Sequence, residues 1–247
     1  MYTYLHLLHG SQQYKDLYTQ LGMAVSFDDL RTQDSASSSL KKQSGNFSEL
    51  SANYGFVYDK RNRAFMPTDG SVTKFSQSFP VVADRAFIAN TFSSSAYKSI
   101  SEDVIGATKI YLSSIDGIGS DDVRLSKRIS LPSRRIRGFE KGKIGPVDGT
   151  DHVGGNHAAA LNFEVNLPSL LPESTKTDIS LFLDFANVWG VDYDSTLDES
   201  SKIRSATGIA ASWLSPVGPM SFVFSSSLSK ADTDVTESFN FNLGTTF

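Results

Sequence analysis

Hydrophobic and polar residues alternate with a period of two in several separate segments of the chain. Between positions 238 and 247 the odd positions are mostly aromatic or aliphatic, and the even positions are small or polar. Successive side chains of a β-strand point to opposite faces, so this pattern predicts strands with one apolar and one polar face. The same alternation recurs at 50–58, 161–167, 179–186 and 220–225.

Two kinds of connection separate these segments. Some are short and rich in turn residues, such as 67–70 and 215–219, whereas others are long and polar, near 29–45, 117–156 and 191–203. Long and short connections alternate for most of the chain, as they do in outer-membrane barrels with short periplasmic turns and long external loops. The predicted strands number about eleven and lie near 2–10, 15–28, 46–60, 71–82, 85–98, 103–116, 157–167, 178–190, 204–215, 219–230 and 236–247.

The strand pattern predicts an all-β fold, an antiparallel transmembrane β-barrel of the outer-membrane type that takes in residues 1–247 as one unit. Hydrophobic residues make up 39% of the chain and charged residues 20%. Those values do not argue against a membrane barrel, because its lipid-facing and lumen-facing residues alternate and keep the mean hydropathy low. No run approaches the length of about 18 apolar residues that a transmembrane helix requires.

Two features of the chain indicate an N-terminally truncated portion of a barrel. Bacterial single-chain barrels close with an even number of strands, whereas the predicted number here is odd. Residues 1–20 also lack the basic region, apolar run and small-residue cleavage site of an export signal. The expectation is therefore that strands and periplasmic domains lie upstream of this sequence.

Composition and motifs argue against several functional classes. A net charge of −4 offers no basic surface for nucleic acid, and the absence of cysteine excludes disulfides and cysteine-bound metal. Asp148, Asp151, His152 and His157 cluster in sequence without the spacing of a zinc motif, and 116–122 lacks the ligand order of a calcium loop. No nucleophile elbow is present. The sequence predicts a protein without cofactors that is not an enzyme.

Three segments carry a resemblance to a known family. They are Ile136-Arg137-Gly138-Phe139 in the longest connection, the run from Gly154 to Asn156, and the run FLDFANVW at 182–189. Together they resemble the bacterial surface antigen family of outer-membrane assembly barrels, in which an R-G-F motif lies at the tip of a long external loop. The resemblance covers residues from about 46 to the end, and Ala186 stands where the family usually has glycine.

The resemblance implies that the long loop folds back into the barrel lumen. Asp184 and Glu164 lie on the polar parity of their strands, so both carboxylates are expected to point inward. The planar guanidinium of Arg137 matches such carboxylates better than a lysine would. Gly138 allows a sharp turn or a close approach to the wall, and Phe139 is expected to pack against the interior.

The C-terminal strand resembles the signal by which outer-membrane barrels are recognised during assembly. The residues concerned are Phe239, Phe241, Leu243, Gly244 and Phe247. In the family this strand also forms a weak seam with the first strand, and an open seam is a template for β-augmentation by another chain.

The resulting hypothesis is a non-enzymatic insertase barrel in the bacterial outer membrane. The resemblance implies as partners the lipid bilayer, unfolded outer-membrane protein clients and, through periplasmic domains, accessory assembly lipoproteins. Two alternatives stay open: a polypeptide-secreting transporter of the same superfamily, and a passive porin or outer-membrane enzyme.

Overall fold

The computed structural model describes residues 3–197, 201–216 and 218–243. Eleven strands form one antiparallel sheet whose order follows the chain, except that β9 lies next to β6. The strands of this sheet are β1 (Thr3–Tyr14), β2 (Leu17–Leu30), β3 (Gly45–Asp59), β4 (Gly70–Ala83), β5 (Phe87–Ser101), β6 (Val104–Gly117), β9 (His157–Leu167), β10 (Thr177–Trp189), β11 (Arg204–Ser215), β12 (Gly218–Ser229) and β13 (Phe239–Leu243).

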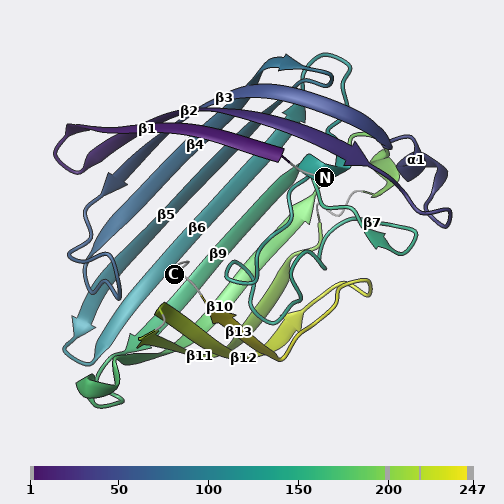
Figure 1. Cartoon of the computed structure of the whole chain (residues 1–247). Helices are drawn as coiled ribbons and strands as arrows, with labels where there is room; N and C mark the ends of the chain where they lie inside the picture. Colours follow the sequence, from purple (N-terminus) through teal and green to yellow (C-terminus); the bar gives the residue numbers. More distant parts are fainter. Residues whose placement is uncertain (1–2, 198–200, 217, 244–247) are drawn as a thin grey trace.

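The sheet curls around a long connection between β6 and β9 (Figure 1). This connection, residues 118–156, contains the 3-10 helix η1 (Leu125–Lys127) and the two-stranded sheet of β7 (Val147–Asp148) and β8 (Asp151–His152). Within the described residues, β1 and β13 are the two edges of the large sheet and are not paired with each other. The remaining short elements are α1 (Ser38–Lys41), η2 (Glu173–Thr175) and η3 (Ser195–Leu197).

The predicted fold class and strand number are confirmed, with corrections at both ends of the sheet. β1 extends to Tyr14 instead of ending near residue 10, and only Lys15 and Asp16 turn the chain into β2. Asp16 has a φ of 68°, a left-handed conformation that suits such a tight turn. The last strand begins at Phe239 instead of 236, because the backbone of 235 and 237 pairs with the long connection.

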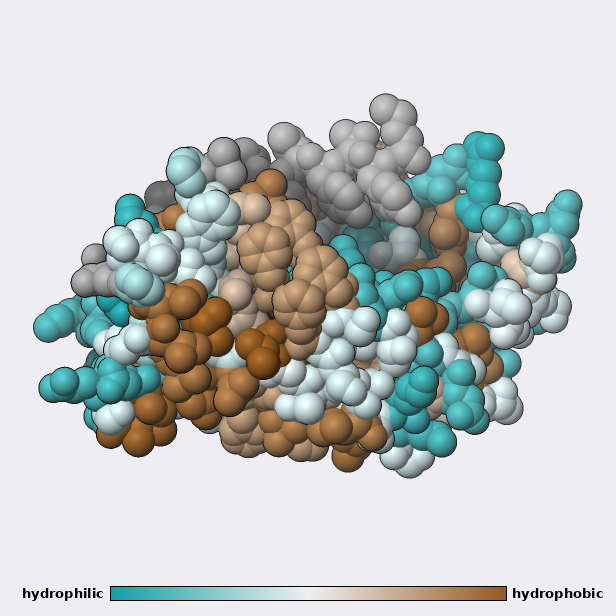
Figure 2. Space-filling model, turned by 90° about the horizontal axis from the view of Figure 1, so that it is seen from below, coloured by the Kyte–Doolittle hydropathy of each residue, from teal (hydrophilic) through white to brown (hydrophobic). Residues whose placement is uncertain are grey.

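The convex face of the sheet is apolar. Leu21 on β2, Phe56 on β3, Ile209 on β11 and Phe224 on β12 are each at least 44% exposed, and each alternates with inward-facing neighbours. Figure 2 shows such side chains gathered in a brown patch, with hydrophilic side chains beside it. No described helix is long and apolar enough to cross a membrane. An apolar outer face on an antiparallel sheet is the arrangement that a lipid bilayer requires.

The packed core lies between the long connection and the concave face of the sheet. Leu131, Ile136, Phe139 and Ile144 come from the connection and are at most 2% exposed. They pack against small side chains of the inner wall, which leave room for them. These wall residues are Ala158, Ala160, Ala186, Val188 and Ala206. The connection is therefore folded into the lumen as part of the core.

Candidate functional site

The register of β9 and β10 forms the side-chain patch that binds the loop, and we call this patch the loop seat. Asp184 lies opposite Asn162, and Phe182 lies opposite Glu164, in an unbroken antiparallel ladder. Residues that lie opposite each other in a ladder share a face of the sheet, so these four side chains form one patch on the concave face. The patch combines two carboxylates, one amide and one aromatic ring.

Arg137 occupies this patch. Its Nε and Nη2 donate to the two carboxylate oxygens of Asp184 at 2.7 and 2.6 Å. Its Nη1 lies 2.9 Å from Oε1 of Glu164, and its backbone N–H donates to Asp184 at 3.1 Å. A guanidinium that binds one carboxylate through two parallel hydrogen bonds is held in orientation as well as in place. The structure thus brings together the three charged residues that the sequence singled out.

Neighbouring side chains complete the ion pairs. Asn162 donates through Nδ2 to Asp184 at 2.8 Å and to the carbonyl of Arg135 at 2.9 Å, so it also holds the loop backbone. Lys109 on β6 donates to Glu164 at 2.7 Å. Asp184 is completely buried, yet it receives hydrogen bonds from both Arg137 and Asn162. Buried charges are tolerated when they are paired and hydrogen-bonded in this way.

The ring of Phe182 supports the guanidinium from one side. The Cζ of Arg137 lies 3.7 Å from the ring centroid, a cation–π contact. Burial alone would lower the pKa of Arg137, but the carboxylates of Asp184 and Glu164 more than offset it, and the pKa lies above its ordinary value. Arg137 is therefore charged at neutral pH.

Arg137 directly precedes Gly138 and Phe139 in the chain, so its position at the wall also brings these two residues there. Gly138 has a φ of 87°, and a Cβ at this position would lie 3.0 Å from Cβ of Ala206 on β11. Glycine alone combines this conformation with such a close approach to the wall. Phe139 is 1% exposed and belongs to the core cluster beneath the loop. Both placements agree with what the family resemblance implies.

Substituting Gly138 by alanine is expected to cost more stability than the same change at Gly119. Gly119 has a φ of 74°, and a Cβ added there would meet no atom within 4 Å, so Gly119→Ala carries only the backbone strain of about 1–2 kcal/mol. Gly138→Ala adds the contact with Ala206. Urea unfolding of the two variants measures the difference, and equal losses would show that Gly138 is needed only for its φ.

A second group of buried ion pairs ties the same connection to the opposite side of the sheet. We call it the Arg124 anchor. Nη2 of Arg124 donates to Glu49 on β3 at 2.8 Å, and Nη1 lies 3.2 Å from Asp28 on β2. Lys127 lies 2.9 Å from Glu49, and Ser126 donates to Asp28 at 2.8 Å. The Arg124 side chain is 1% exposed, so this end of the connection is as deeply fixed as Arg137.

Further contacts fix the connection to the neighbouring loops. Asp192, in the loop 190–203, accepts hydrogen bonds from the backbone of Val123 at 2.7 Å and from Arg128 and Asn156. Burial alone would raise the pKa of Asp192, but these donors lower it below its ordinary value. Asp148, set aside as a metal ligand, accepts hydrogen bonds from Ser37 and Tyr193. No group of three or more potential metal ligands occurs in the described part of the chain.

The loop also pairs with the segment that leads into the last strand. Glu237 N–H donates to Gly138, Glu140 N–H donates to Val235, and Val235 N–H donates to Lys143, at 3.0–3.1 Å. This segment is fixed from the other side by Arg204 of β11, whose Nε and Nη2 donate to Asp234 at 2.9 Å. Backbone hydrogen bonds therefore connect the Arg137 loop to the segment that leads into β13.

The C-terminal strand places its predicted residues on the outside of the sheet. Phe239, Phe241 and Leu243 are 47%, 45% and 61% exposed. Phe239 and Phe241 lie beside Phe224 and Phe222 of β12, with ring centroids 5.0 and 5.1 Å apart. Gly244 and Phe247 lie outside the described residues. The described part of β13 hydrogen-bonds to β12 through one of its two edges, and its other edge has no partner strand among the described residues.

An antiparallel sheet that curls, with an apolar convex face and a polar concave face, is typical of outer-membrane β-barrel proteins. Within that class the chain belongs to the Omp85 superfamily, because the Omp85 superfamily domain model matches residues 5–247. The prediction of a portion similar to the barrel of the assembly factor BamA is confirmed.

Curated relatives and a solved structure agree with this family. The chain is 31% identical over 139 residues to the outer membrane protein assembly factor BamA of Neisseria meningitidis, covering 45% of this chain and 17% of that protein. It is 28% identical over 138 residues to the sorting and assembly machinery component 50 homolog of Mus musculus, covering 54% of this chain and 29% of that protein. The chain therefore spans less than a third of the length of either relative.

The solved structure is that of BamA from Haemophilus ducreyi lacking POTRA domains 1-3. It superposes with a TM-score of 0.85 at 22% identity, over 97% of this chain and 54% of that chain. At this identity the match concerns the fold. It supports the assignment of the curled sheet to the barrel type seen in that protein.

Proposed function

We propose that this chain is the barrel portion of a protein that assembles and inserts other β-barrel proteins in an outer membrane. The observation that carries the proposal is the loop held inside an Omp85-type sheet by Arg137, Asp184 and Glu164. Relatives named as assembly factors from a bacterium and from a mammal support it. Because those relatives come from such different organisms, an outer membrane is the proposed location, and the bacterial one is the narrower proposal.

The proposed role of the loop seat is to hold the external loop in the lumen. Arg137, Gly138, Phe139, Glu164 and Asp184 would act together, since each contributes a contact that the others need. The described edge of β13, which carries Phe239, Phe241 and Leu243, is proposed as the place where a client strand is added. An unpaired strand edge in lipid is costly, so it favours pairing with an incoming strand.

The partners of the proposed function are the lipid bilayer and unfolded outer-membrane proteins, with accessory assembly lipoproteins as a further proposal. A passive porin has a water-filled channel, whereas the described lumen holds a packed loop whose side chains are buried. A polypeptide-secreting transporter of the same superfamily stays the second candidate. No catalytic constellation was predicted from the sequence, and the proposal is not enzymatic.

The proposal is tested by refolding the chain into liposomes and adding a urea-unfolded eight-stranded client barrel. We expect the client to fold about tenfold faster than in liposomes that hold an unrelated barrel, which corresponds to about 1.4 kcal/mol off the folding barrier. Client folding is followed by gel mobility without heating. Equal client rates in the two kinds of liposome would contradict the proposal, and large steady conductance steps in a planar bilayer would favour the porin instead.

A further inference from the structure

A cavity of about 370 Å³ lies beneath the loop, between the Arg137 segment and the inner wall. Seven basic side chains line it but only two acidic ones, although the whole chain has a net charge of −4. The basic side chains come from the loop, from two wall strands and from one turn. They are Arg134, Arg135, Arg137 and Lys141 of the loop, Lys74 of β4, Lys109 of β6, and Arg61 of the turn between β3 and β4.

Both carboxylates at this cavity are already bound. Glu164 is neutralised by Arg137 and Lys109, and Glu237 accepts a hydrogen bond from Asn240 at 2.7 Å. No carboxylate in the described part of the chain lies within ion-pair distance of Arg134 or Arg135. Arg61, Arg137 and Lys109 are ion-paired, whereas Lys74, Arg134, Arg135 and Lys141 have no ion-pair partner among the described residues. These four cations exceed the single remaining charge of Glu237, so the cavity has an excess of positive charge.

Arg135 shows this excess most clearly. Its guanidinium is partly buried and stacks over the ring of Tyr111 at 4.5 Å, and its Nε has no hydrogen-bond partner. Burial and the adjacent charge of Arg134 lower the pKa of Arg135 below its usual value. The buried arginines 124, 137 and 204 each bind a carboxylate instead. An anion beside Arg135 would supply the missing acceptor.

The wall opposite these arginines carries neutral hydrogen-bonding groups. Ser93 and Ser95 line the cavity from β5, and Ser212 and Ser221, which are paired across β11 and β12, line it from the other side. Hydroxyl groups can donate to or accept from a peptide backbone without selecting a particular side chain. The cavity thus offers charge selection on the loop side and backbone contacts on the wall side.

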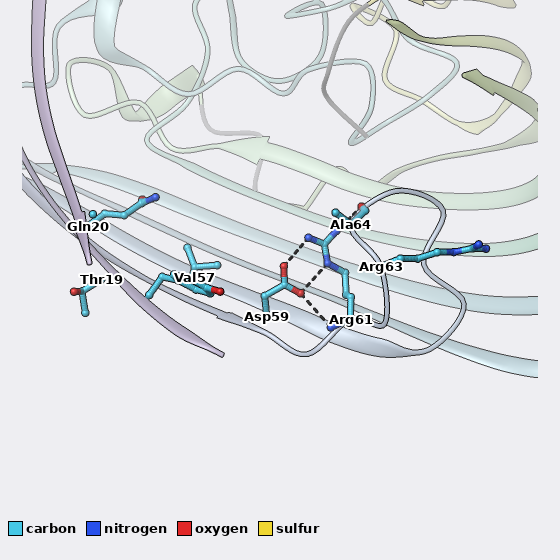
Figure 3. Close-up of a pocket in the computed structure, with 9 residues that line it drawn as sticks. Thr19, Gln20, Val57, Asp59, Arg61, Arg63 and Ala64 are labelled. Carbon is cyan, nitrogen blue, oxygen red and sulfur yellow. Dashed lines mark hydrogen bonds and ion pairs between the residues drawn. The ribbon is translucent and has the colours of Figure 1, made fainter. Parts of the chain in front are cut away.

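A second hollow of about 710 Å³ adjoins the cavity through Arg61, which lines both. In Figure 3 Arg61 lies against Asp59, with 2.7 Å between Nη2 and Oδ2, while Arg63 extends away from this pair. The two hollows therefore meet at the turn 60–69 between β3 and β4, and Arg63 adds a further basic side chain to the lining of the second one.

We propose that this basic cavity binds an extended polypeptide segment that carries aspartate or glutamate side chains. The carboxylates would pair with Arg134 and Arg135, and the segment's backbone would bond to the serine wall. Low local dielectric strengthens such pairs relative to water. A lipid headgroup is disfavoured because the cavity opens on the concave face, whereas the apolar face that meets lipid is the convex one. The proposal stands independently of the insertase function.

The test measures binding of fluorescein-labelled octapeptides to the full chain refolded in a zwitterionic detergent. We expect a peptide of alternating Asp and Ser to bind at low salt, and the matching Asn–Ser and Lys–Ser peptides to bind at least about tenfold more weakly. In the double variant R134Q/R135Q the affinity for the acidic peptide should fall by about tenfold or more. The expected control is R31Q/R85Q, which removes two arginines that do not line the cavity and leaves binding unchanged.

Three results would overturn the proposal: equal affinity of R134Q/R135Q and the unaltered chain, equal binding of the Asn–Ser peptide, or the same loss in R31Q/R85Q. Inorganic phosphate is added as a competitor, and full displacement of the acidic peptide at about millimolar phosphate would show a site for small anions instead. Gel mobility without heating confirms that each variant is folded. A photo-crosslinking version of the peptide should label residues 133–141, and labelling confined to the convex face would contradict the assignment.

Discussion

Replacing Arg137 by alanine is expected to destabilise the folded barrel more than any other single change in the lumen. Asp184 is completely buried and would lose both of its guanidinium hydrogen bonds, leaving one donor from Asn162 and one from the backbone. Removing one partner of a buried ion pair costs about 3–5 kcal/mol, and water in the lumen reduces that cost. Phe139 and the loop core would also lose their fixed position.

The measurement is the fraction that keeps its folded gel mobility as the sample is heated, together with urea unfolding. Arg137→Lys should be intermediate, because lysine keeps the charge but not the planar fork that binds both oxygens of Asp184. Arg31→Ala is the control, since that side chain is 84% exposed and its pair with Asp29 lies in solvent. If Arg137→Ala keeps its folded gel mobility on heating to the same temperature as the unaltered chain, then the ion pairs of Arg137 do not hold the loop in the lumen.

The strands were predictable from the sequence because their chemistry is local. Alternation fixes which residues face lipid, and turn residues fix where strands stop, as at 67–70 between β3 and β4. The exceptions were the two end strands of the sheet: β1 extends to Tyr14, and the last strand begins at Phe239. Residues 236–238 have strand-like sequence, but the backbone of Glu237 is bonded to Gly138 of a loop that lies far away in sequence. No pattern within the segment itself contains that information.

The loop seat was predictable only in part. Strand parity places Glu164 and Asp184 inward, and the R-G-F resemblance points to Arg137. The same parity places Phe182 and Asn162 inward, but their roles as a ring beneath the guanidinium and as a second donor to Asp184 were missed. The register of β9 against β10 decides these contacts. The sequence did contain a signal for these two roles: both residues lie at inward positions beside the predicted ion pair, and one is aromatic and the other polar.

The Arg124 anchor was not predicted at all. Asp28 and Glu49 lie on inward positions of β2 and β3, but a connection as long as 118–156 can bring any of several basic residues to them. The path of the loop through the lumen depends on its packing against the wall, not on its local sequence. Arg204 with Asp234 was also missed, because the segment before β13 is positioned by backbone hydrogen bonds to residues 138–143 that lie far away in sequence.

Replacing Arg124 by alanine is the second change with a large expected effect, at about 3 kcal/mol. Asp28 and Glu49, with side chains 1% and 4% exposed, would lose their shared cation, although Lys127 still pairs with Glu49. Lys127→Ala is the matched control and should cost less, because Arg124 continues to pair with both carboxylates. Adding Asp28→Asn to Arg124→Ala should recover part of the loss, because it removes the buried carboxylate that is left without a cation while Lys127 still pairs with Glu49.

Combining Arg124→Ala with Arg137→Ala tests whether the two anchors act on one element. The two arginines bind opposite parts of the sheet, β2 and β3 on one side and β9 and β10 on the other. Independent distant sites add within about 0.3–0.5 kcal/mol. Because both hold the same packed loop, release at one end should remove much of what the other stabilises, so we expect the double variant to lose at least about 1 kcal/mol less than the two single losses combined. Strict additivity in urea unfolding would show that each anchor stabilises only its own part of the wall, and that the loop does not join the two sides of the sheet.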